Sequence, residues 1–554
     1  MRWQLALPAV RCKSLLCCVL VSGYSQQLHP PPDANASIEK IFAQLNRSTS
    51  PGCVAGAAIA GVPVVTVAYG MADLEHSVPL TPQSVLEAGS VSKQFTAGAV
   101  LLLAQQGKLS LDDSVRKYIP DLPDYLAPIT IRQLIYHTSG LRDWGDLEEI
   151  AGWPRSTRVY THAHVLEILS RQRSLNYAPG TDWSYTNTGY NLLVILTERI
   201  TKKSFQEFTK EVMFSPLGMS STQWRDDFRR IVPNRAVAYD QKGDNIRTLM
   251  PFENIYGNGG LLTTVGDLLK WNQNFADAKL GGLPFIQAQQ EPGRLTNGQT
   301  FPYAAGLFVG TWRGLREVSH SGGTAGYRAW LARYPDQGVS VALLCNTSAA
   351  DVVDLGHRVA EVYLGSVIRS NRMESPVASD PAVLRSDAGL YVSARDHSTL
   401  TFDLKDGRLR FNGSAPLTAI SQDTFALADN DEVRVEFESS QSRKTSRVRL
   451  TLPGEPDSFF DKVEAEHPGS GDLAPMAGEY VSDEAETTFK VTLQDGRLVI
   501  YRRPDVTIPL TPTYRDAFSS SIGSVRFIRD ARGRIIEMSV SEDRIWDLRF
   551  RRVR

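Results

Sequence analysis

The segment that opens with Ser90-Val91-Ser92-Lys93 limits what this chain can fold into more than any other. Residues 95–104, just after it, are uncharged and almost all apolar. Because this run is apolar on every side, it predicts a helix buried in the centre of a domain and ended at Gly107. Ser90 and Lys93 then lie one turn apart on the same face, at the amino end of that helix. A hydroxyl, a lysine of tunable pKa and the free N–H groups of a helix start predict an activated nucleophile.

On its own, S-x-x-K fits an ordinary helix start with a solvated lysine equally well, so the rest of the chain has to decide. The chain has 554 residues, 42% of them hydrophobic and 22% charged, which predicts a soluble protein of several domains. The formal net charge is −1, without a basic block. This composition argues against nucleic acid as a partner.

The amino end is typical of a signal peptide. Positive charges at Arg2, Arg11 and Lys13 accompany a short apolar stretch at 15–21 and small residues before Gln26. We therefore predict a signal peptide over residues 1–25 and a periplasmic or secreted protein; a disordered amino tail is the alternative. The apolar stretch is too short to span a bilayer, so no integral membrane span is expected.

Two cysteines remain after the predicted signal, Cys53 and Cys345, each at the end of a probable strand. They predict either one disulfide, as exported proteins often have, or two separate buried thiols. His162-Ala163-His164 comes nearest to a metal-binding pattern but lacks a matching set of ligands. It is more typical of a helix start capped by Thr161. Neither a metal nor a cofactor is expected.

The first part of the chain, residues 38–368, predicts one α+β domain. A hairpin is expected over 53–60 and 62–69, helices in the middle, and three strands from 318, over 327–334 and over 339–345. Strands at both ends of the domain predict an antiparallel sheet backed by the Ser90 helix. The stretch 369–381, rich in Ser, Pro and Asn, predicts a linker.

The carboxyl part contains an internal repeat. Ala-Gly-Leu-Tyr-Val-Ser at 388–393 returns as Ala-Gly-Glu-Tyr-Val-Ser at 477–482, and Asp406-Gly407 returns as Asp495-Gly496. Both matches have the same offset of 89 residues, and Asp-Gly marks a tight hairpin turn. The alternating sequence predicts two small antiparallel barrels over 382–465 and 473–554, with a two-module β-sandwich as the alternative.

Two further motifs carry candidate chemistry. The first is Tyr185-Thr186-Asn187. A tyrosine beside a cation in a dry site ionises more readily, and Asn187 could hold both Lys93 and a substrate amide. Taken alone, Tyr-x-Asn is more often a turn or a buried structural tyrosine.

The second motif is His320-Ser321-Gly322-Gly323, on the first of the three late strands. Its small residues let a substrate backbone lie along the strand edge. The N–H groups of Ser90 and Gly323 would form an oxyanion hole. A glycine-rich hairpin with an incidental histidine is the structural alternative.

The order S-x-x-K, Y-x-N and H-x-G resembles the serine β-lactamase and penicillin-binding protein superfamily, in particular its class C β-lactamase branch. Strings similar to those of that branch occur at 130–134, 137–141, 214–219 and 257–261. The resemblance implies an α/β-sandwich of the penicillin-recognising type and no metal. We assign no catalytic role to His137 or Asn258, whose strings are typical of structural turns.

The resemblance also implies a mechanism through an acyl-enzyme. Ser90 would attack a carbonyl, and Lys93 and Tyr185 would move the protons. The oxyanion would be held by the N–H groups of Ser90 and Gly323. The groups implied to bind substrate are Asn187, His320, Ser321 and Gly322.

His320 departs from the class C β-lactamases, which carry a lysine there. A mostly neutral histidine gives a weaker field for a β-lactam carboxylate, and H-x-G resembles the D-aminopeptidases, carboxypeptidases and some esterases. In the D-aminopeptidase architecture two barrels follow the catalytic domain, and a barrel loop narrows the active site.

We therefore predict an exported serine hydrolase of small peptide-like or ester substrates, a D-amino-acid-specific aminopeptidase or carboxypeptidase. The alternatives are a class C-like β-lactamase, a carboxylesterase on the same site, or a hydrolase-derived binding protein. Nothing in the sequence indicates an oligomeric state.

Overall fold

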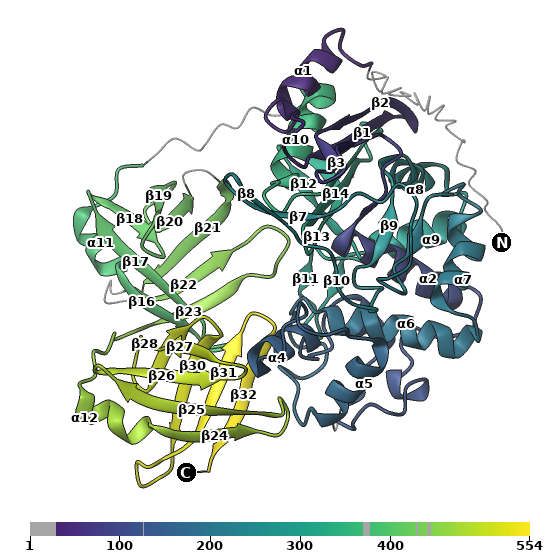
Figure 1. Ribbon diagram of the computed structural model, residues 1–554. Coiled ribbons are helices and arrows are strands. Elements are labelled where there is room, and N and C mark those ends of the chain that lie inside the picture. Colours follow the sequence, from purple (N-terminus) through teal and green to yellow (C-terminus); the bar gives the residue numbers. More distant parts are fainter. Residues whose placement is uncertain (1–28, 126, 369–376, 428–429, 440–444, 554) are drawn as a thin grey trace, which may run out of the picture.

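The computed structural model describes residues 29–553, apart from 126, 369–376, 428–429 and 440–444. The predicted signal peptide and most of the predicted linker lie outside the described residues. Figure 1 shows a mixed α/β domain and, on one side of it, two β-domains formed by the chain from Pro381 onwards. Among the described helices, none has the length and apolar character needed to cross a membrane.

A six-stranded antiparallel sheet organises the first domain. Its strand order is β12-β13-β14-β15-β1-β2, so strands from both ends of the domain meet at the β15–β1 pair. In that pair Cys53 lies opposite Cys345, and a disulfide joins them. The predicted sheet is thus confirmed, and the first of the two alternatives for the cysteines is the one observed. The strands are β1 (Cys53–Ile59), β2 (Val62–Tyr69), β12 (Phe308–Trp312), β13 (Leu315–Thr324), β14 (Tyr327–Tyr334) and β15 (Val339–Cys345).

Helices cover both faces of this sheet. Alternate residues of β1 point to opposite sides, so Ala55 and Ala57 pack with α1 (Ala34–Phe42) and α10 (Val352–Leu364). Val54 and Ala58 pack with α8 (Val265–Asp277) and the central helix α2 (Lys93–Gln105). Gly56 also faces α8, since a Cβ there would lie 3.1 Å from Leu269. Thr264 caps α8, with its Oγ1 accepting from the Asp267 N–H.

The central helix α2 is buried from Lys93 to Leu103. It packs against α6 (Asn187–Thr201) and α9 (Gly282–Gln290). These helices belong to the mainly helical part of the domain, which in sequence lies between β2 and β12. The other helices of this region are α3 (Ile131–Ile135), α4 (Trp144–Ala151), α5 (His162–Arg171) and α7 (Phe205–Thr209). The short strands are β3 (Met71–Asp73), β4 (Val78–Pro79), β5 (Leu86–Glu87), β6 (Gln223–Trp224), β7 (Tyr239–Lys242), β8 (Asn245–Thr248), β9 (Leu261–Thr263), β10 (Gly293–Arg294) and β11 (Thr300–Phe301).

The first β-domain is a closed eight-stranded antiparallel barrel, preceded by α11 (Pro381–Asp387). Pro381, at the end of the predicted linker, is therefore the first residue of a helix. The barrel contradicts the β-sandwich alternative. Its strands are β16 (Gly389–Ser393), β17 (Thr399–Lys405), β18 (Arg408–Phe411), β19 (Ala415–Ala419), β20 (Thr424–Leu427), β21 (Asn430–Ser439), β22 (Thr445–Thr451) and β23 (Ser458–Val463).

The second β-domain is one curved nine-stranded sheet in the order β27-β26-β25-β24-β32-β31-β30-β29-β28. It forms a nearly closed barrel, and the short helix α12 (Ser470–Leu473) precedes it. With the first barrel it confirms the predicted fold class. Its strands are β24 (Gly478–Ser482), β25 (Thr487–Gln494), β26 (Arg497–Arg502), β27 (Val506–Pro509), β28 (Thr511–Pro512), β29 (Ala517–Ser520), β30 (Gly523–Arg529), β31 (Ile535–Glu542) and β32 (Ile545–Arg552).

The sequence repeat has the same structural role in both barrels. The Tyr391 hydroxyl donates to the Asp387 carbonyl at 2.8 Å, and Tyr480 donates to the Met476 carbonyl at 2.7 Å. Each bond ties the first strand to the helical turn before it. Asp-Gly turns with positive φ at both residues join β17 to β18 and β25 to β26, as a two-residue hairpin loop requires.

Candidate active site

Ser90 and Lys93 occupy consecutive helical segments. Ser90 lies in a 3-10 turn, η1 (Gly89–Ser92), and Lys93 is the first residue of α2. The predicted single helix start is thus replaced by a tighter turn that leads into the α-helix. Lys93 Nζ lies 3.1 Å from Ser90 Oγ. The amine is therefore in direct contact with the hydroxyl one turn before it, as the motif predicts.

Two oxygens hold the Lys93 amine in place. Nζ donates to Asn187 Oδ1 at 3.0 Å and to the Asn258 carbonyl at 2.9 Å. Burial lowers the pKa of Lys93 well below its ordinary value, and the nearby Arg544 guanidinium lowers it further, whereas Asp143 opposes the shift. Because burial disfavours the charged form, Lys93 loses its proton more readily than an exposed lysine.

Tyr185 lies across the cavity from Lys93, just before α6. Lys93 Nζ is 4.7 Å from the centre of its ring. Burial raises the pKa of Tyr185, although the Ser90 hydroxyl and the Arg544 cation both oppose that rise. The expectation that ionisation of this tyrosine is favoured is therefore wrong, because burial outweighs the nearby cations. Among the described residues its hydroxyl has no hydrogen-bond partner of ordinary geometry.

Two residues outside the Tyr185-Thr186-Asn187 motif accept hydrogen bonds from its backbone N–H groups. The Asn187 N–H donates to the Asp143 carboxylate at 2.6 Å, and the Thr186 N–H donates to His137 Nδ1 at 3.2 Å. The His137 ring also packs against the Tyr185 ring, with centres 4.3 Å apart. His137, like Asn258, comes from a string that the sequence indicated to be a structural turn. Both residues do belong to turns, but these turns contact the catalytic groups directly.

The edge of β13 lies against η1 at van der Waals distance. A Cβ on Gly89, whose φ is +49°, would lie 2.5 Å from the Gly323 nitrogen, and one on Gly322 would lie 2.1 Å from the Ala88 carbonyl oxygen. Only glycine allows this approach. Ser90 and Gly323 consequently line one cavity, where their N–H groups can form the predicted oxyanion hole.

His320 is 3% exposed and points into the same cavity. Its Nδ1 donates to the Ser321 carbonyl at 2.6 Å, and Nε2 lies 3.4 Å from the Tyr303 hydroxyl. Burial lowers the pKa of His320 to about 3, with a further contribution from Lys93. The imidazole is therefore neutral at physiological pH and brings no positive charge to β13.

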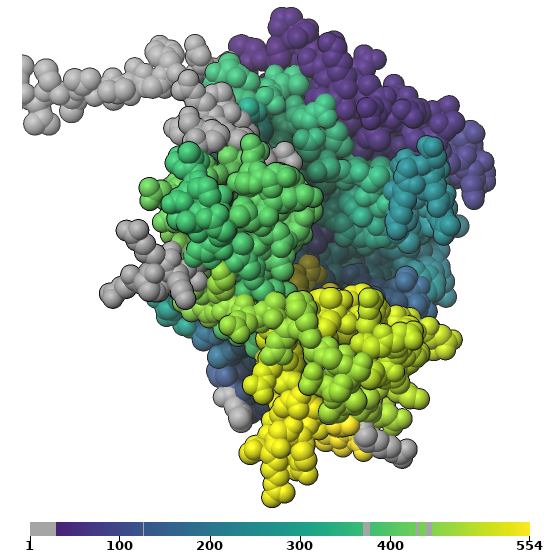
Figure 2. Space-filling view, turned by 90° about the vertical axis from the view of Figure 1, so that its left-hand side faces the viewer, coloured from purple at the N-terminus to yellow at the C-terminus, as the bar shows by residue number. Residues whose placement is uncertain are grey.

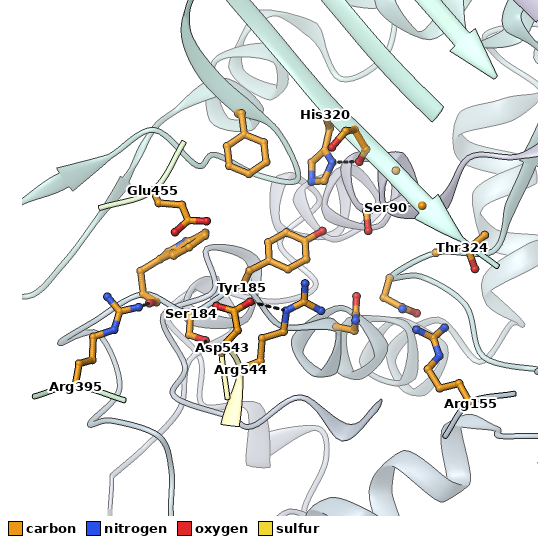
Figure 3. Close-up of a pocket in the computed structure, with 18 residues that line it drawn as sticks. Ser90, Arg155, Ser184, Tyr185, His320, Thr324, Arg395, Glu455, Asp543 and Arg544 are labelled. Carbon is orange, nitrogen blue, oxygen red and sulfur yellow. Dashed lines mark hydrogen bonds and ion pairs between the residues drawn. The ribbon is translucent and has the colours of Figure 1, made fainter. Parts of the chain in front are cut away.

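Figure 3 shows the cavity of about 410 Å³ around Ser90, with Tyr185 and His320 pointing into it. All the predicted site residues except Lys93 line it, and Lys93 lies behind Ser90. Both barrels contribute residues to the wall of this cavity, and none of these residues was predicted from the sequence. They are Arg395 from the β16–β17 loop, Glu455 from the β22–β23 loop, and Asp543 and Arg544 from the β31–β32 loop.

Arg544 lies beside one of the catalytic groups. Its guanidinium carbon lies 5.1 Å from the centre of the Tyr185 ring. The loop is fixed because the Arg544 carbonyl accepts from the Asp143 N–H at 3.3 Å and from Asn176 Nδ2 at 3.0 Å. Asp143 thus contacts the barrel loop through its backbone and Asn187 through its side chain. Asp543-Arg544 occupies a hairpin turn, and nothing in its local sequence signals an active-site role.

The two histidines of His162-Ala163-His164 contact backbone groups. His162 Nε2 lies 3.0 Å from the Tyr256 carbonyl oxygen, and His164 Nδ1 accepts from the Thr161 N–H at 3.1 Å. Both stand at the start of α5, where the sequence placed them.

Comparison with known proteins identifies the family. The Beta-lactamase family model matches residues 38–364, more than half of the chain. The chain therefore belongs to the β-lactamase family and is a serine hydrolase, which confirms the resemblance drawn from its motifs.

Relatives extend the similarity into the barrels. A D-aminopeptidase of Brucella anthropi (strain ATCC 49188) is 26% identical over 515 residues, which span 87% of this chain and 91% of that protein. Penicillin-binding protein 4* of Bacillus subtilis (strain 168) is 30% identical over 295 residues, spanning 50% of this chain and 64% of that protein.

Solved structures share the fold. The octameric penicillin-binding protein homologue from Pyrococcus abyssi has a TM-score of 0.54 at 21% identity and covers 77% of this chain and 99% of its own. The D-amino acid amidase from Ochrobactrum anthropi SV3 has a TM-score of 0.50 at 22% identity and covers 60% of this chain and 99% of its own.

Proposed function

We propose that this chain is an exported serine hydrolase that cleaves amide bonds on the carbonyl side of D-amino acid residues through an acyl-enzyme at Ser90. The observation that carries the proposal is the set of three contacts made by the Lys93 amine. A neutral amine has two N–H groups and one lone pair. The oxygens of Asn187 and Asn258 can only accept, so they take both N–H groups. The lone pair is left facing the Ser90 hydroxyl.

Acylation then follows from these positions. Ser90 Oγ bonds to the substrate carbonyl carbon as its proton passes to Lys93, and the N–H groups of Ser90 and Gly323 bind the resulting oxyanion. The C–N bond breaks as the leaving nitrogen takes the proton of the Tyr185 phenol, and the Lys93 ammonium returns a proton to Tyr185. Water attacks the ester by the reverse route, which releases the acid and restores the Ser90 hydroxyl.

The two pKa shifts fit this division of roles. Burial favours the neutral amine of Lys93 and the neutral phenol of Tyr185. The first group can therefore accept a proton and the second can donate one. Neither Lys93 nor Tyr185 then has to change its protonation state before substrate binds.

Two observations favour a D-amino acid amide over a β-lactam. Neutral His320 offers no cation to a β-lactam carboxylate, which weakens the β-lactamase alternative. The similarity to a D-aminopeptidase also continues through both barrels, over 515 residues. A carboxylesterase on the same site stays an alternative, since an ester carbonyl would react with the same groups.

The test is a set of rates on D-alanine p-nitroanilide, its L enantiomer, nitrocefin and p-nitrophenyl acetate. We expect the D-anilide to be the best of the four, and Ser90→Ala to abolish both its turnover and covalent labelling by a fluorophosphonate. Ser110→Ala, on an exposed loop, is the control for serine removal. Faster turnover of nitrocefin or of the acetate would contradict the choice of substrate, and labelling of the Ser90→Ala protein would contradict the nucleophile.

Export is supported by the amino-terminal sequence and by the disulfide between Cys53 and Cys345, because disulfides persist in oxidising compartments. Sequencing the amino terminus of the protein from a cell envelope or culture fluid tests it. We expect the mature chain to begin at Gln26. An intact Met1 on active protein in the cytosol would refute export.

A further inference from the structure

A second cavity of about 640 Å³ lies beside the active-site cavity, between β12, α10 and the first barrel. Phe308, Ser321 and Glu455 line both cavities, so the two adjoin at these residues. We call the second cavity the Trp312 groove. Its walls include Trp312 of β12, Val353 of α10, and Leu452 and Pro453 of the β22–β23 loop. Figure 2 shows a hollow on the side of the molecule where the barrels meet the first domain.

The wall of the Trp312 groove is chiefly apolar, and several of its polar groups bond one another, while the side chains of Glu432 and Glu455 also line it. The Trp312 ring stacks on the His357 ring, with centres 4.4 Å apart and an angle of 8° between the ring planes. His357 Nε2 lies 2.8 Å from Glu317. The same carboxylate accepts from the hydroxyls of Ser319 and Tyr334, each at 2.8 Å. The groove therefore presents mainly ring faces and aliphatic groups, which suit an apolar ligand.

The position of Tyr185 identifies the part of the substrate that points towards this groove. Tyr185 delivers a proton to the leaving nitrogen, so that nitrogen must lie on the Tyr185 side of Ser90. In Figure 3, Tyr185 and Glu455 lie on one side of Ser90, and Thr324 and Arg155 lie on the other. The groove begins at Glu455 and Phe308, on the leaving-group side.

We propose that the Trp312 groove binds an aromatic or branched apolar side chain on the leaving group. The preferred substrate is then a peptide in which an apolar residue follows the D-residue, rather than a simple amide. This inference rests on the proposed function, and it adds a specificity site shared between the first domain and the first barrel. Burial of one such side chain should raise kcat/KM at least tenfold over glycine.

The test compares D-alanyl-phenylalaninamide, with either enantiomer of phenylalanine, and D-alanyl-glycinamide. We expect the phenylalanine substrate to be cleaved with at least tenfold higher kcat/KM. Val353→Arg, which places a charged chain in the groove, and Trp312→Ala should both bring this ratio towards one. Val353 is 38% exposed, so its replacement leaves the core intact. The matched control is Val62→Arg, at a 65% exposed valine on β2, the opposite edge of the sheet, which should keep the wild-type ratio.

A ratio near one in the wild type, or a ratio that both groove variants leave unchanged, would overturn the inference. Calorimetric binding of phenylalaninamide and glycinamide to the Ser90→Ala protein gives a readout without turnover. Tighter binding of phenylalaninamide that Val353→Arg removes supports the groove even if neither dipeptide is cleaved, in which case the proposed function alone fails. Equal binding of the two amides overturns the groove whatever the rates are.

Discussion

The two barrels share a repeated core but contact the active site in different ways. The first is closed, and its Arg395 bonds to the Trp183 carbonyl at 3.0 Å at the mouth of the cavity. The second is open between β27 and β28, and it places Arg544 against the Tyr185 ring. The repeated residues, such as Tyr391 and Tyr480, fix each barrel from within. The repeat therefore sets the architecture, whereas loops outside the repeat set what each barrel does.

The anchoring of the barrels differs as well. Arg142 reaches into the second barrel, where Nη1 donates to Glu484 at 2.7 Å and Nη2 donates to the Trp546 carbonyl at 3.2 Å. The side chains of Arg142 and Glu484 are 2% and 11% exposed. Arg395 of the first barrel pairs with Asp182 at 3.3 Å, and both of these side chains are 28% exposed. The second barrel is thus held by a buried ion pair and the first by a more exposed one.

Breaking the buried pair should have the largest effect. Arg142→Met leaves Glu484 without its cation in a buried position, and we expect a loss of about 3–5 kcal/mol in the free energy of unfolding. Chemical denaturation measures it. Arg173→Gln is the matched control at the same interface, since Arg173 and Asp483 are 74% and 59% exposed and such pairs contribute about 0–1 kcal/mol. Equal losses in the two variants would show that the buried pair does not anchor the barrel.

The next effect concerns the chemistry. Arg544→Gln should lower kcat/KM at neutral pH roughly tenfold, or about 1.4 kcal/mol of transition-state free energy. Lys93 acts only when neutral, so activity falls as the pH drops through the pKa of Lys93. The Arg544 cation lowers that pKa, as Arg155 also does, whereas Asp143 raises it. Loss of the cation therefore raises the pKa and moves the acid limb of the rate profile to higher pH.

The pH profile of Arg544→Gln is measured beside Arg544→Lys, which should restore part of the wild-type position because it keeps the charge. Arg534→Gln, in an exposed turn of the same barrel, serves as the control. A lower rate with an unmoved acid limb would mean that Arg544 acts only by shaping the cavity. The second barrel would then affect the active site through the shape of the cavity and not through the charge of Arg544.

The smallest expected effect tests what the barrels have in common. Tyr391→Phe and Tyr480→Phe each remove one hydroxyl and its bond to a carbonyl in the preceding turn. Each should cost about 0.5–1.5 kcal/mol in the free energy of unfolding, without a change in kcat/KM. Thermal denaturation of the pair decides whether the repeated position is equivalent in both barrels. A loss of stability in only one of the two variants would show that the repeated tyrosine has the same sequence position in both barrels but not the same structural role.

Local patterns predicted much of this molecule. A few neighbouring residues were enough to predict the helix after Lys93, the hairpin that starts at Cys53 and the strand that ends at Cys345, because each element has a local pattern of apolar residues. The Asp-Gly turns also require particular backbone angles, which local sequence can signal. The juxtaposition of Ser90, Lys93, Tyr185, Asn187 and Gly323 was predicted because their motifs have a known order. The roles assigned to these residues stay predictions until the variants are measured.

Other parts of the site could not be read from the sequence. Asp143 looks like an ordinary helix cap, and Arg544 like a residue in a hairpin turn. The pKa of Tyr185 was misjudged because burial, not the neighbouring cation, decides its direction. Burial depends on what the rest of the chain brings to the site, and here that includes a barrel loop far along the sequence.

The amino-acid sequence alone was enough to predict the nucleophile motif, the antiparallel sheet of the first domain and the two barrels of the repeat. These are short-range properties, set by side-chain type, spacing and backbone preference. The three-dimensional arrangement was needed to show which loops complete the cavity, that burial lowers the pKa of His320 further, and that an apolar groove adjoins the active site. Those features depend on distance and on exclusion of water between segments hundreds of residues apart, and neither quantity is carried by local sequence.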